Sequence, residues 1–166
     1  MVQRQRRSGF SIIELMVVVA IIGILAAIAI PMFTGAARNA KTSEAFLQLN
    51  RLAKGAKSYH NANTGYPVGT AAPKPGTDGG ACGRTDRKFA VDTGWAADNA
   101  WVSLGFQIDE PNMFTYHYTS ADPKTATATA VGDLDCDAKL ITYKLDLATA
   151  DGNPTSILTE PPKNSD

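Results

Sequence analysis

A long apolar segment near the N-terminus constrains the fold of this chain more than any other feature. From Phe10 to Phe33 the only polar side chains are those of Ser11 and Glu14. As an α-helix this segment would be roughly 36 Å long, and the hydrocarbon core of a bilayer is about 30 Å thick. The segment therefore predicts a membrane-spanning helix. Glu14 is an exception, because a carboxylate within a span is costly and usually marks a function.

The charges predict the orientation of this span. Arg4, Arg6 and Arg7 precede it, and no acidic residue does. Positively charged flanks stay in the cytoplasm, so the bulk of the chain is expected outside. Without these three arginines, 13 Lys and Arg residues stand against 16 Asp and Glu residues. We therefore expect no nucleic-acid-binding surface, which needs a clustered basic face.

Two ordinary interpretations of the segment compete with a functional one. The small residues "AAIA" at 26–29 resemble the cleavage site of a secretory signal peptide. A plain signal anchor would instead simply remain in the membrane. Neither interpretation explains Glu14.

The stretch "SGFSIIELMVVVAIIGILAAIAIPMF" resembles the leader and N-terminal helix of type IV prepilins and their pseudopilin relatives. Those families have a short basic leader that ends in Gly, then Phe, then an apolar stretch with Glu at its fifth position. Gly9, Phe10 and Glu14 stand at these positions. Ser11-Ile12 departs mildly from the commoner Thr-Leu. The resemblance implies an α+β fold, in which a long N-terminal helix packs against a small antiparallel sheet.

The resemblance also implies a sequence of processing and assembly steps. A prepilin peptidase would remove the leader, residues 1–9, by cleavage after Gly9 and would methylate the new N-terminus at Phe10. Residues 10–33 would first anchor the precursor in the inner membrane, with its head in the periplasm, and later form the core of an extracellular filament. The implied partners are copies of the chain, other pilins, the peptidase, the inner-membrane assembly machinery and the membrane.

Glu14 has a physical role in this scheme. Cleavage would create an ammonium group at Phe10, one helical turn away, and an anion near a helix N-terminus is also favoured by the macrodipole. In a filament, Glu14 of one subunit would neutralise the Phe10 amine of a neighbour, because an unpaired carboxylate is expensive in a low-dielectric environment. Glu14 is thus predicted to act in assembly and not in catalysis.

Gly23 and Pro31 are weak points of the predicted helix. A Gly within a helix costs about 1 kcal/mol relative to Ala, and an interior Pro removes a hydrogen bond at a cost of about 3 kcal/mol. One interpretation is a tolerated kink. The resemblance implies instead that residues 23–31 lose helical order in a filament.

An amphipathic pattern follows over residues 34–60 and ends at "NANTGYP", residues 61–67. Charged residues occupy the other positions of this pattern. Its apolar stripe predicts a core-facing side for a globular head over residues 61–158. The stripe consists of Phe46, Leu49, Leu52, Ala53, Ala56 and Tyr59.

The head is predicted to contain an irregular region followed by a sheet. Residues 61–112 are rich in Gly, Pro, Asp and Asn, and Trp95 and Trp101 are expected to anchor them to the helix. An adhesive surface cluster is the alternative for the two tryptophans. Alternation around residues 114–119, 125–129 and 141–147 predicts a three-stranded antiparallel meander. Residues 159–166 are expected to form an exposed tail.

Two groups of residues in the head suggest a disulfide and a calcium site. Cys82 and Cys136 would pair in an oxidising compartment, which would stabilise the irregular region by about 4 kcal/mol in the chain-entropy model. Alternatively, the disulfide would serve contacts between neighbouring subunits. Asp133, Asp135 and Asp137 alternate as in the start of a calcium loop. Because Ala138 stands where Gly is expected and no Glu completes the pattern, a solvated acidic turn is the favoured interpretation, and no other cofactor is expected.

No enzyme is expected. His60 and His117 are far apart in the sequence, and no nucleophile motif, metal-ligand spacing or phosphate loop accompanies them. The resemblance favours a structural pilin. The alternatives are a pseudopilin of a type II secretion system and a membrane-anchored periplasmic domain that does not polymerise.

Overall fold

The computed structural model describes residues 9–76 and 80–162. The predicted leader lies outside the described residues except for Gly9, and so do residues 163–166 of the predicted tail. The chain divides into two compact units, with a boundary between Asn39 and Ala40. The predicted long helix is present as α1, Ile12–Asn63, which continues through this boundary.

In the first unit, α1 has apolar side chains on all sides. None of its residues from Ile12 to Asn39 is buried by the part of the chain that the structure describes. This part of α1 is long and apolar enough to cross a membrane.

In the second unit, one side of α1 is buried in the head. The apolar residues on this side recur every three or four positions, and they face the sheet: Ala45, Leu49, Leu52, Ala53 and Ala56. The predicted stripe is wrong at Phe46, which is 48% exposed. His60 is buried at the end of the helix instead, where its Nε2 lies 2.8 Å from Oγ1 of Thr149.

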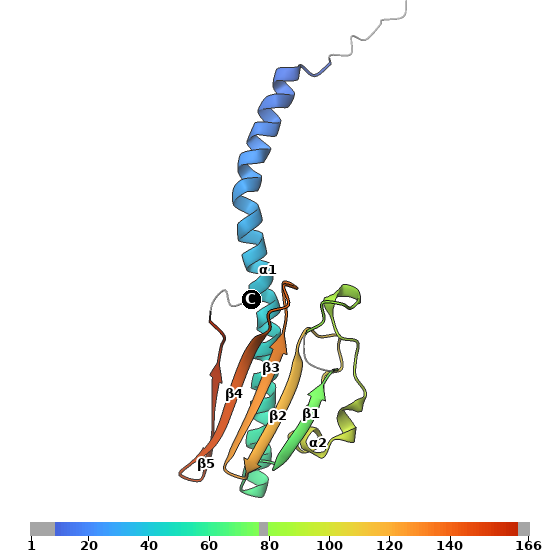
Figure 1. Cartoon of the computed structure of the whole chain (residues 1–166). Coiled ribbons are helices and arrows are strands. Elements are labelled where there is room, and N and C mark those ends of the chain that lie inside the picture. Colours follow the sequence, from blue (N-terminus) through green and yellow to red (C-terminus); the bar gives the residue numbers. More distant parts are fainter. Residues whose placement is uncertain (1–8, 77–79, 163–166) are drawn as a thin grey trace, which may run out of the picture. The chain divides into compact units, whose positions relative to one another are not determined.

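The sheet has five antiparallel strands in the order β1-β2-β3-β4-β5 (Figure 1). The predicted meander corresponds to β2, Thr115–Asp122, β3, Thr125–Gly132, and β4, Ile141–Ala150. The edge strands β1, Gly69–Lys74, and β5, Asn153–Thr159, were not predicted. Each contains a proline, which edge strands tolerate because one of their sides makes no ladder hydrogen bonds.

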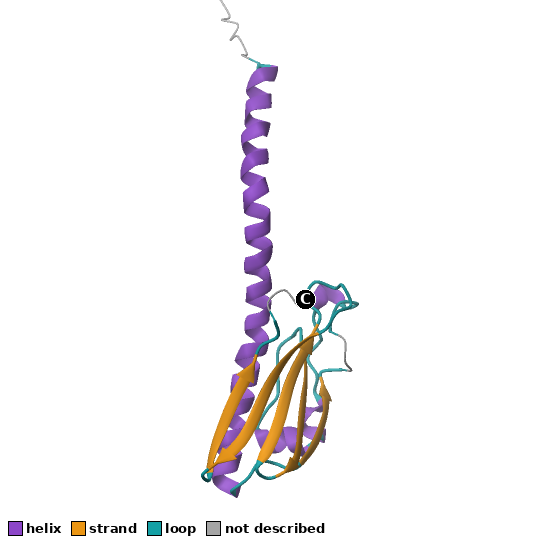
Figure 2. Ribbon diagram, turned by 60° about the vertical axis from the view of Figure 1, so that its left-hand side comes forward, coloured by secondary structure: helices purple, strands orange, loops and turns teal. Residues whose placement is uncertain are grey.

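The core lies between α1 and the inner face of the sheet (Figure 2). In the centre of the sheet, large and small side chains alternate across the strands. Tyr118 pairs with Ala128, which pairs with Leu145, and Ala130 lies in the same way between Tyr116 and Tyr143. All of these side chains are buried. The alanines of β3 therefore leave room above the middle of the sheet for neighbouring side chains.

The described residues of the irregular region before β2 form a short helix, α2, Asn99–Leu104, and two 3₁₀ turns, η1, Thr85–Arg87, and η2, Gly94–Ala97. Trp95 and Trp101 are buried in the core, so the predicted anchoring role is confirmed and the adhesive surface cluster is wrong. Trp101 Nε1 donates a 2.9 Å hydrogen bond to the carbonyl oxygen of Ala72 in β1. Asp98 caps α2 through Ala100 N–H and also accepts from Ala72 N–H.

Candidate assembly site

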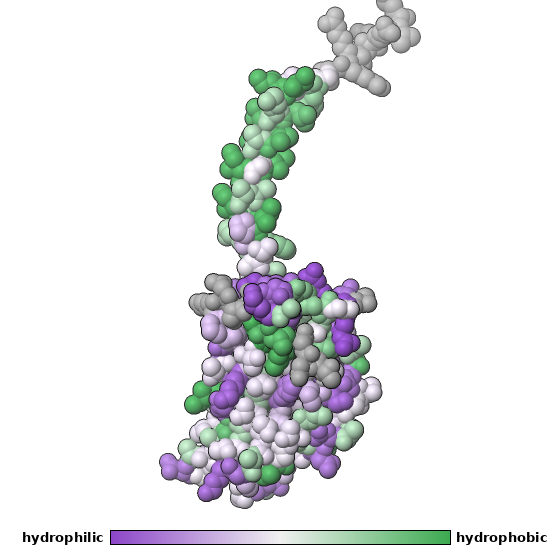
Figure 3. Space-filling model, in the orientation of Figure 1, coloured by the Kyte–Doolittle hydropathy of each residue, from purple (hydrophilic) through white to green (hydrophobic). Residues whose placement is uncertain are grey.

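The N-terminal half of α1 presents a continuous apolar surface that the chain itself does not cover. Figure 3 shows apolar side chains along this part of the helix. Phe10 and Phe33, which bound the apolar segment, are 85% and 75% exposed. Such a surface is unfavourable in water and is stabilised by lipid or by other apolar helices.

Glu14 closes a capping box at the start of this helix. Its Oε2 accepts a 2.9 Å hydrogen bond from the backbone N–H of Ser11, and Ser11 Oγ lies 3.3 Å from Glu14 N. This reciprocal pair satisfies two of the backbone donors that a helix N-terminus leaves free. Glu14 therefore has a local partner in the uncleaved chain, and its side chain turns back toward the N-terminus.

Ser11 is a residue that the sequence reasoning treated only as a mild departure. The spacing Ser-x-x-Glu just before an apolar run is the signature of a capping box and would have identified it. The proposed pairing of Glu14 with a free Phe10 amine stays a prediction, because Phe10 is still joined to Gly9 in this chain.

Both predicted weak points lie within continuous helix. A methyl group added at Gly23 would meet nothing within 4 Å. Pro31 has no N–H to donate to the carbonyl of Ala27, and Thr34 Oγ1 donates a 3.0 Å hydrogen bond to the Pro31 carbonyl. The loss of helical order over residues 23–31 in a filament stays a prediction.

The head is cross-linked as the two cysteines and the expected oxidising compartment predicted. Cys82 and Cys136 form a disulfide with their Cα atoms 5.5 Å apart. The bond joins the irregular region to the turn between β3 and β4.

That same turn contains the three aspartates of the predicted calcium loop. Their ligand oxygens lie within 4.8 Å of one another. Each carboxylate already accepts hydrogen bonds: Asp133 from Cys136 N–H and Ala138 N–H, Asp135 from Asp137 N–H, and Asp137 from Lys139 N–H and Nζ. Contact with Lys139 lowers the pKa of Asp137. The arrangement fits a turn held by its own carboxylates better than a calcium cage, and calcium binding stays an untested prediction.

A second feature that sequence reasoning missed is the contact between α1 and the loops of the head. Glu44 Oε1 accepts a 2.8 Å hydrogen bond from Met113 N–H, and Lys41 Nζ donates a 2.7 Å hydrogen bond to the Leu134 carbonyl. Burial raises the pKa of Glu44, although the hydrogen bond from Met113 opposes this change. The amphipathic pattern shows that Glu44 is off the apolar stripe but gives no sign of its distant partner.

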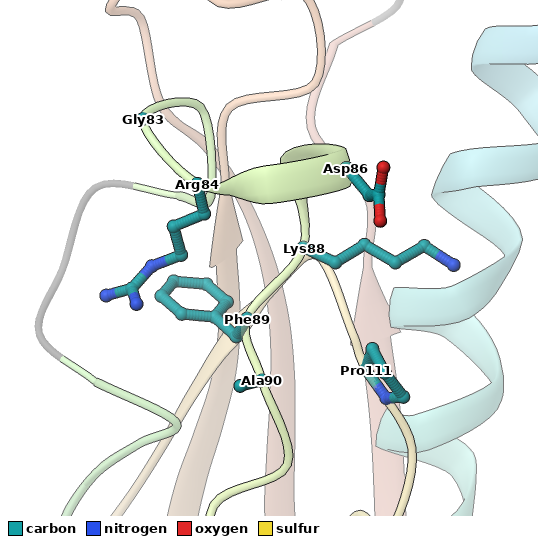
Figure 4. Close-up of a pocket in the computed structure, with 7 residues that line it drawn as sticks. All are labelled: Gly83, Arg84, Asp86, Lys88, Phe89, Ala90 and Pro111. Atoms are coloured by element: carbon teal, nitrogen blue, oxygen red, sulfur yellow. The ribbon is translucent and has the colours of Figure 1, made fainter.

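An open hollow of about 750 Å³ lies beside η1 (Figure 4). The Arg84 guanidinium lies 4.6 Å from the centre of the Phe89 ring, on one side of the hollow. Lys88 and Asp86 extend toward the other side in Figure 4. The charged groups therefore diverge and do not converge on one ligand position.

The two histidines are not brought together. His60 packs against Tyr66 on the inner side of the sheet, with their ring centres 4.9 Å apart. His117 alternates along β2 with the buried Tyr116 and Tyr118 and so lies on the outer side. The two histidines therefore do not act together as one acid and base pair.

Comparisons with known proteins find similarity to part of the chain. The family model for the prokaryotic N-terminal methylation motif matches residues 4–30. The type IV major pilin protein PilA of Myxococcus xanthus is 51% identical over 61 residues, which are 37% of this chain and 28% of PilA. The fimbrial protein EcpC of Eikenella corrodens is 46% identical over 70 residues, 42% of this chain and 45% of EcpC.

A secretion protein is similar to a comparable extent. The type II secretion system core protein G of Pseudomonas aeruginosa is 40% identical over 65 residues, 39% of this chain and 46% of that protein. The chain thus spans less than half the length of these three relatives. No solved structure matches. The resemblance to type IV pilins and type II secretion pseudopilins is confirmed.

Proposed function

We propose that this chain is a structural subunit of a type IV pilus and polymerises through the N-terminal half of α1. The observation that carries this proposal is the apolar half-helix that the chain leaves uncovered, with Glu14 at its first turn. The methylation motif over residues 4–30 supports the same conclusion.

Processing prepares this helix for assembly. The arginines of the leader hold the precursor in the inner membrane with its head in the periplasm. A prepilin peptidase cleaves after Gly9 and methylates Phe10, which leaves an ammonium group within one helical turn of Glu14. The capping contact with Ser11 supports a pairing of these two charges, because it directs the Glu14 carboxylate toward the new N-terminus.

Assembly then transfers the apolar half of α1 from lipid into a bundle of identical helices. Apolar contacts are non-directional and do not fix a register. Glu14 fixes the register, because burial of its carboxylate in the bundle is unfavourable unless it pairs with the Phe10 amine of a neighbour. Other pilins and the inner-membrane assembly machinery are the remaining partners, and the assembled fibre is extracellular.

A pseudopilin of a type II secretion system is a second candidate, favoured by the similarity to the secretion core protein. It shares the N-terminal processing but forms a short periplasmic fibre. A third possibility, a membrane-anchored domain that does not polymerise, leaves Glu14 only its capping contact with Ser11 and no use for its charge.

The test is to shear fibres from the surface of the source cells and to identify their subunits by mass spectrometry. The pilus proposal predicts abundant chain that begins with N-methylated Phe10. Absence from sheared fibres, together with the processed form in the inner membrane, would contradict a pilus and support the secretion role.

A further inference from the structure

The exposed side of α1 in the head bears a row of positive charges. From Ala45 to Asn63 the helix has Arg51, Lys54 and Lys57 but no Asp or Glu. Arg51 and Lys54 are exposed and Lys57 is half-exposed. Residues three apart are neighbours on a helix surface, so these three side chains form one continuous cationic row.

No ion pair engages this cationic row within residues 9–76 and 80–162. The lysines that do form ion pairs are elsewhere in the head, as in the pairs Lys74 with Asp92 and Lys144 with Asp146. Like charges this close repel one another, and an opposite charge from outside would relieve that repulsion.

The chain has an acidic counterpart on a different segment. Asp109 and Glu110 are consecutive and exposed in the segment between α2 and β2. In the described part of the chain neither residue forms an ion pair, and Asp109 has only a long, 3.4 Å contact with Gln107 Nε2. We call these two residues the acidic pair.

Two other exposed carboxylates, those of Asp122 and Asp137, are less available to a partner. Asp122 accepts hydrogen bonds from Lys124 N–H and Thr125 N–H, and Asp137 binds Lys139. Pro111 follows the acidic pair and restricts the backbone next to it. The acidic pair therefore combines exposure, adjacent charges and freedom from internal partners.

We infer that the cationic row of one copy docks against the acidic pair of a neighbouring copy. This inference rests on the proposed function as a polymerising subunit. The contact joins two different segments of the same chain, and a heterologous contact of this kind builds a fibre when its rotation does not close a ring. Leu47, 66% exposed one turn before Arg51, supplies apolar surface next to the row.

The contact adds specificity that the apolar helices lack. Charge complementarity between surfaces selects partners and fixes register more than it adds affinity. The cationic row and the acidic pair would therefore set how neighbouring heads align, while the N-terminal halves of α1 supply most of the cohesion.

Charge reversal in the full-length chain tests this contact. The variants are K54E/K57E, D109K/E110K and the combination of all four substitutions, each expressed in source cells in place of the parent. The readout is the ratio of sheared fibre subunit to cleaved subunit in the membrane. We expect each double variant to lower this ratio by about tenfold, since juxtaposed like charges disfavour docking, and the combination to restore much of it.

A control variant, K124E, reverses an exposed charge in the turn between β2 and β3 and should leave the ratio unchanged. Normal cleavage and an intact Cys82–Cys136 disulfide verify that each variant folds. If the parent forms no fibres at all, the proposed function fails. If the parent forms fibres and either double variant matches it, or the combination gives no recovery, this inference is overturned.

Zero-length cross-linking of amines to carboxylates gives a second measurement. Peptides that join Lys54 or Lys57 to Asp109 or Glu110 are expected from parent fibres and not from cleaved subunits in the membrane. Cross-links of the same two lysines to lipid or to another protein, without any to the acidic pair, would contradict the inference.

Discussion

The two halves of α1 belong to one continuous helix but are stabilised in different ways. Leu25 in the first half is 62% exposed, whereas Leu52 in the second is fully buried. The second half has its own sheet, loops and core to pack against. Within residues 9–76 and 80–162 the first half has none of these, so its apolar surface needs an apolar environment from outside the chain. This difference separates the part of α1 that the chain stabilises by itself from the part that it leaves exposed.

The largest difference between the halves should follow from the same substitution made in each. Leu52→Ala removes a fully buried side chain and is expected to lower the free energy of unfolding of the head by about 3–5 kcal/mol. Leu25→Ala should leave that free energy unchanged. Denaturant unfolding of the full chain in detergent micelles, followed by the fluorescence of Trp95 and Trp101, measures both. Equal effects would contradict the separation between the two halves.

Two glycines, one in each half of α1, allow a second comparison of the two halves. A methyl group at Gly55 would overlap the carbonyl oxygen of Leu104, whereas one at Gly23 would meet nothing within 4 Å. Gly55→Ala is therefore expected to destabilise the head by about 1–3 kcal/mol, and Gly23→Ala should not destabilise it. The same unfolding measurement applies. A Gly55→Ala head as stable as the parent would show that α1 and α2 do not approach so closely.

The smallest expected effect concerns Glu44. Because burial raises its pKa, the ionised carboxylate disfavours folding, and its unfavourable contribution appears as the pH rises through that pKa. Glu44→Gln keeps an acceptor for Met113 N–H without the charge. The variant should gain stability relative to the parent between about pH 4 and pH 7. A constant difference over this range would contradict a raised pKa.

Sequence reasoning identified the elements with strong local patterns. The apolar run and the amphipathic stripe predicted α1, and strict alternation predicted β2, β3 and β4. The cysteine pairing was also predicted correctly, because compartment and count left few options. At the candidate site, Gly9, Phe10 and Glu14 were assigned from the resemblance to prepilins, and their roles stay predictions.

The remaining features depend on contacts between distant parts of the chain. β1 and β5 have weak strand patterns and are ordered by pairing with β2 and β4. The hydrogen bond from Met113 to Glu44 depends on how a loop meets α1. The three aspartates look like metal ligands in sequence, but the turn supplies each with N–H partners that no spacing rule shows. Ser11, by contrast, belonged to a recognisable capping pattern.

Substitution of Glu14 tests the central claim, that the uncovered half of α1 assembles by matching each carboxylate to a neighbour's new amine. Glu14→Gln is the most direct variant, because Gln at this position retains the capping contact with Ser11 but has no charge. The measurement is the ratio of sheared fibre subunit to cleaved subunit in the membrane, with Glu14→Ala alongside. We predict that both variants are cleaved normally and that neither enters fibres efficiently. A Glu14→Gln chain that assembles as well as the parent would contradict it.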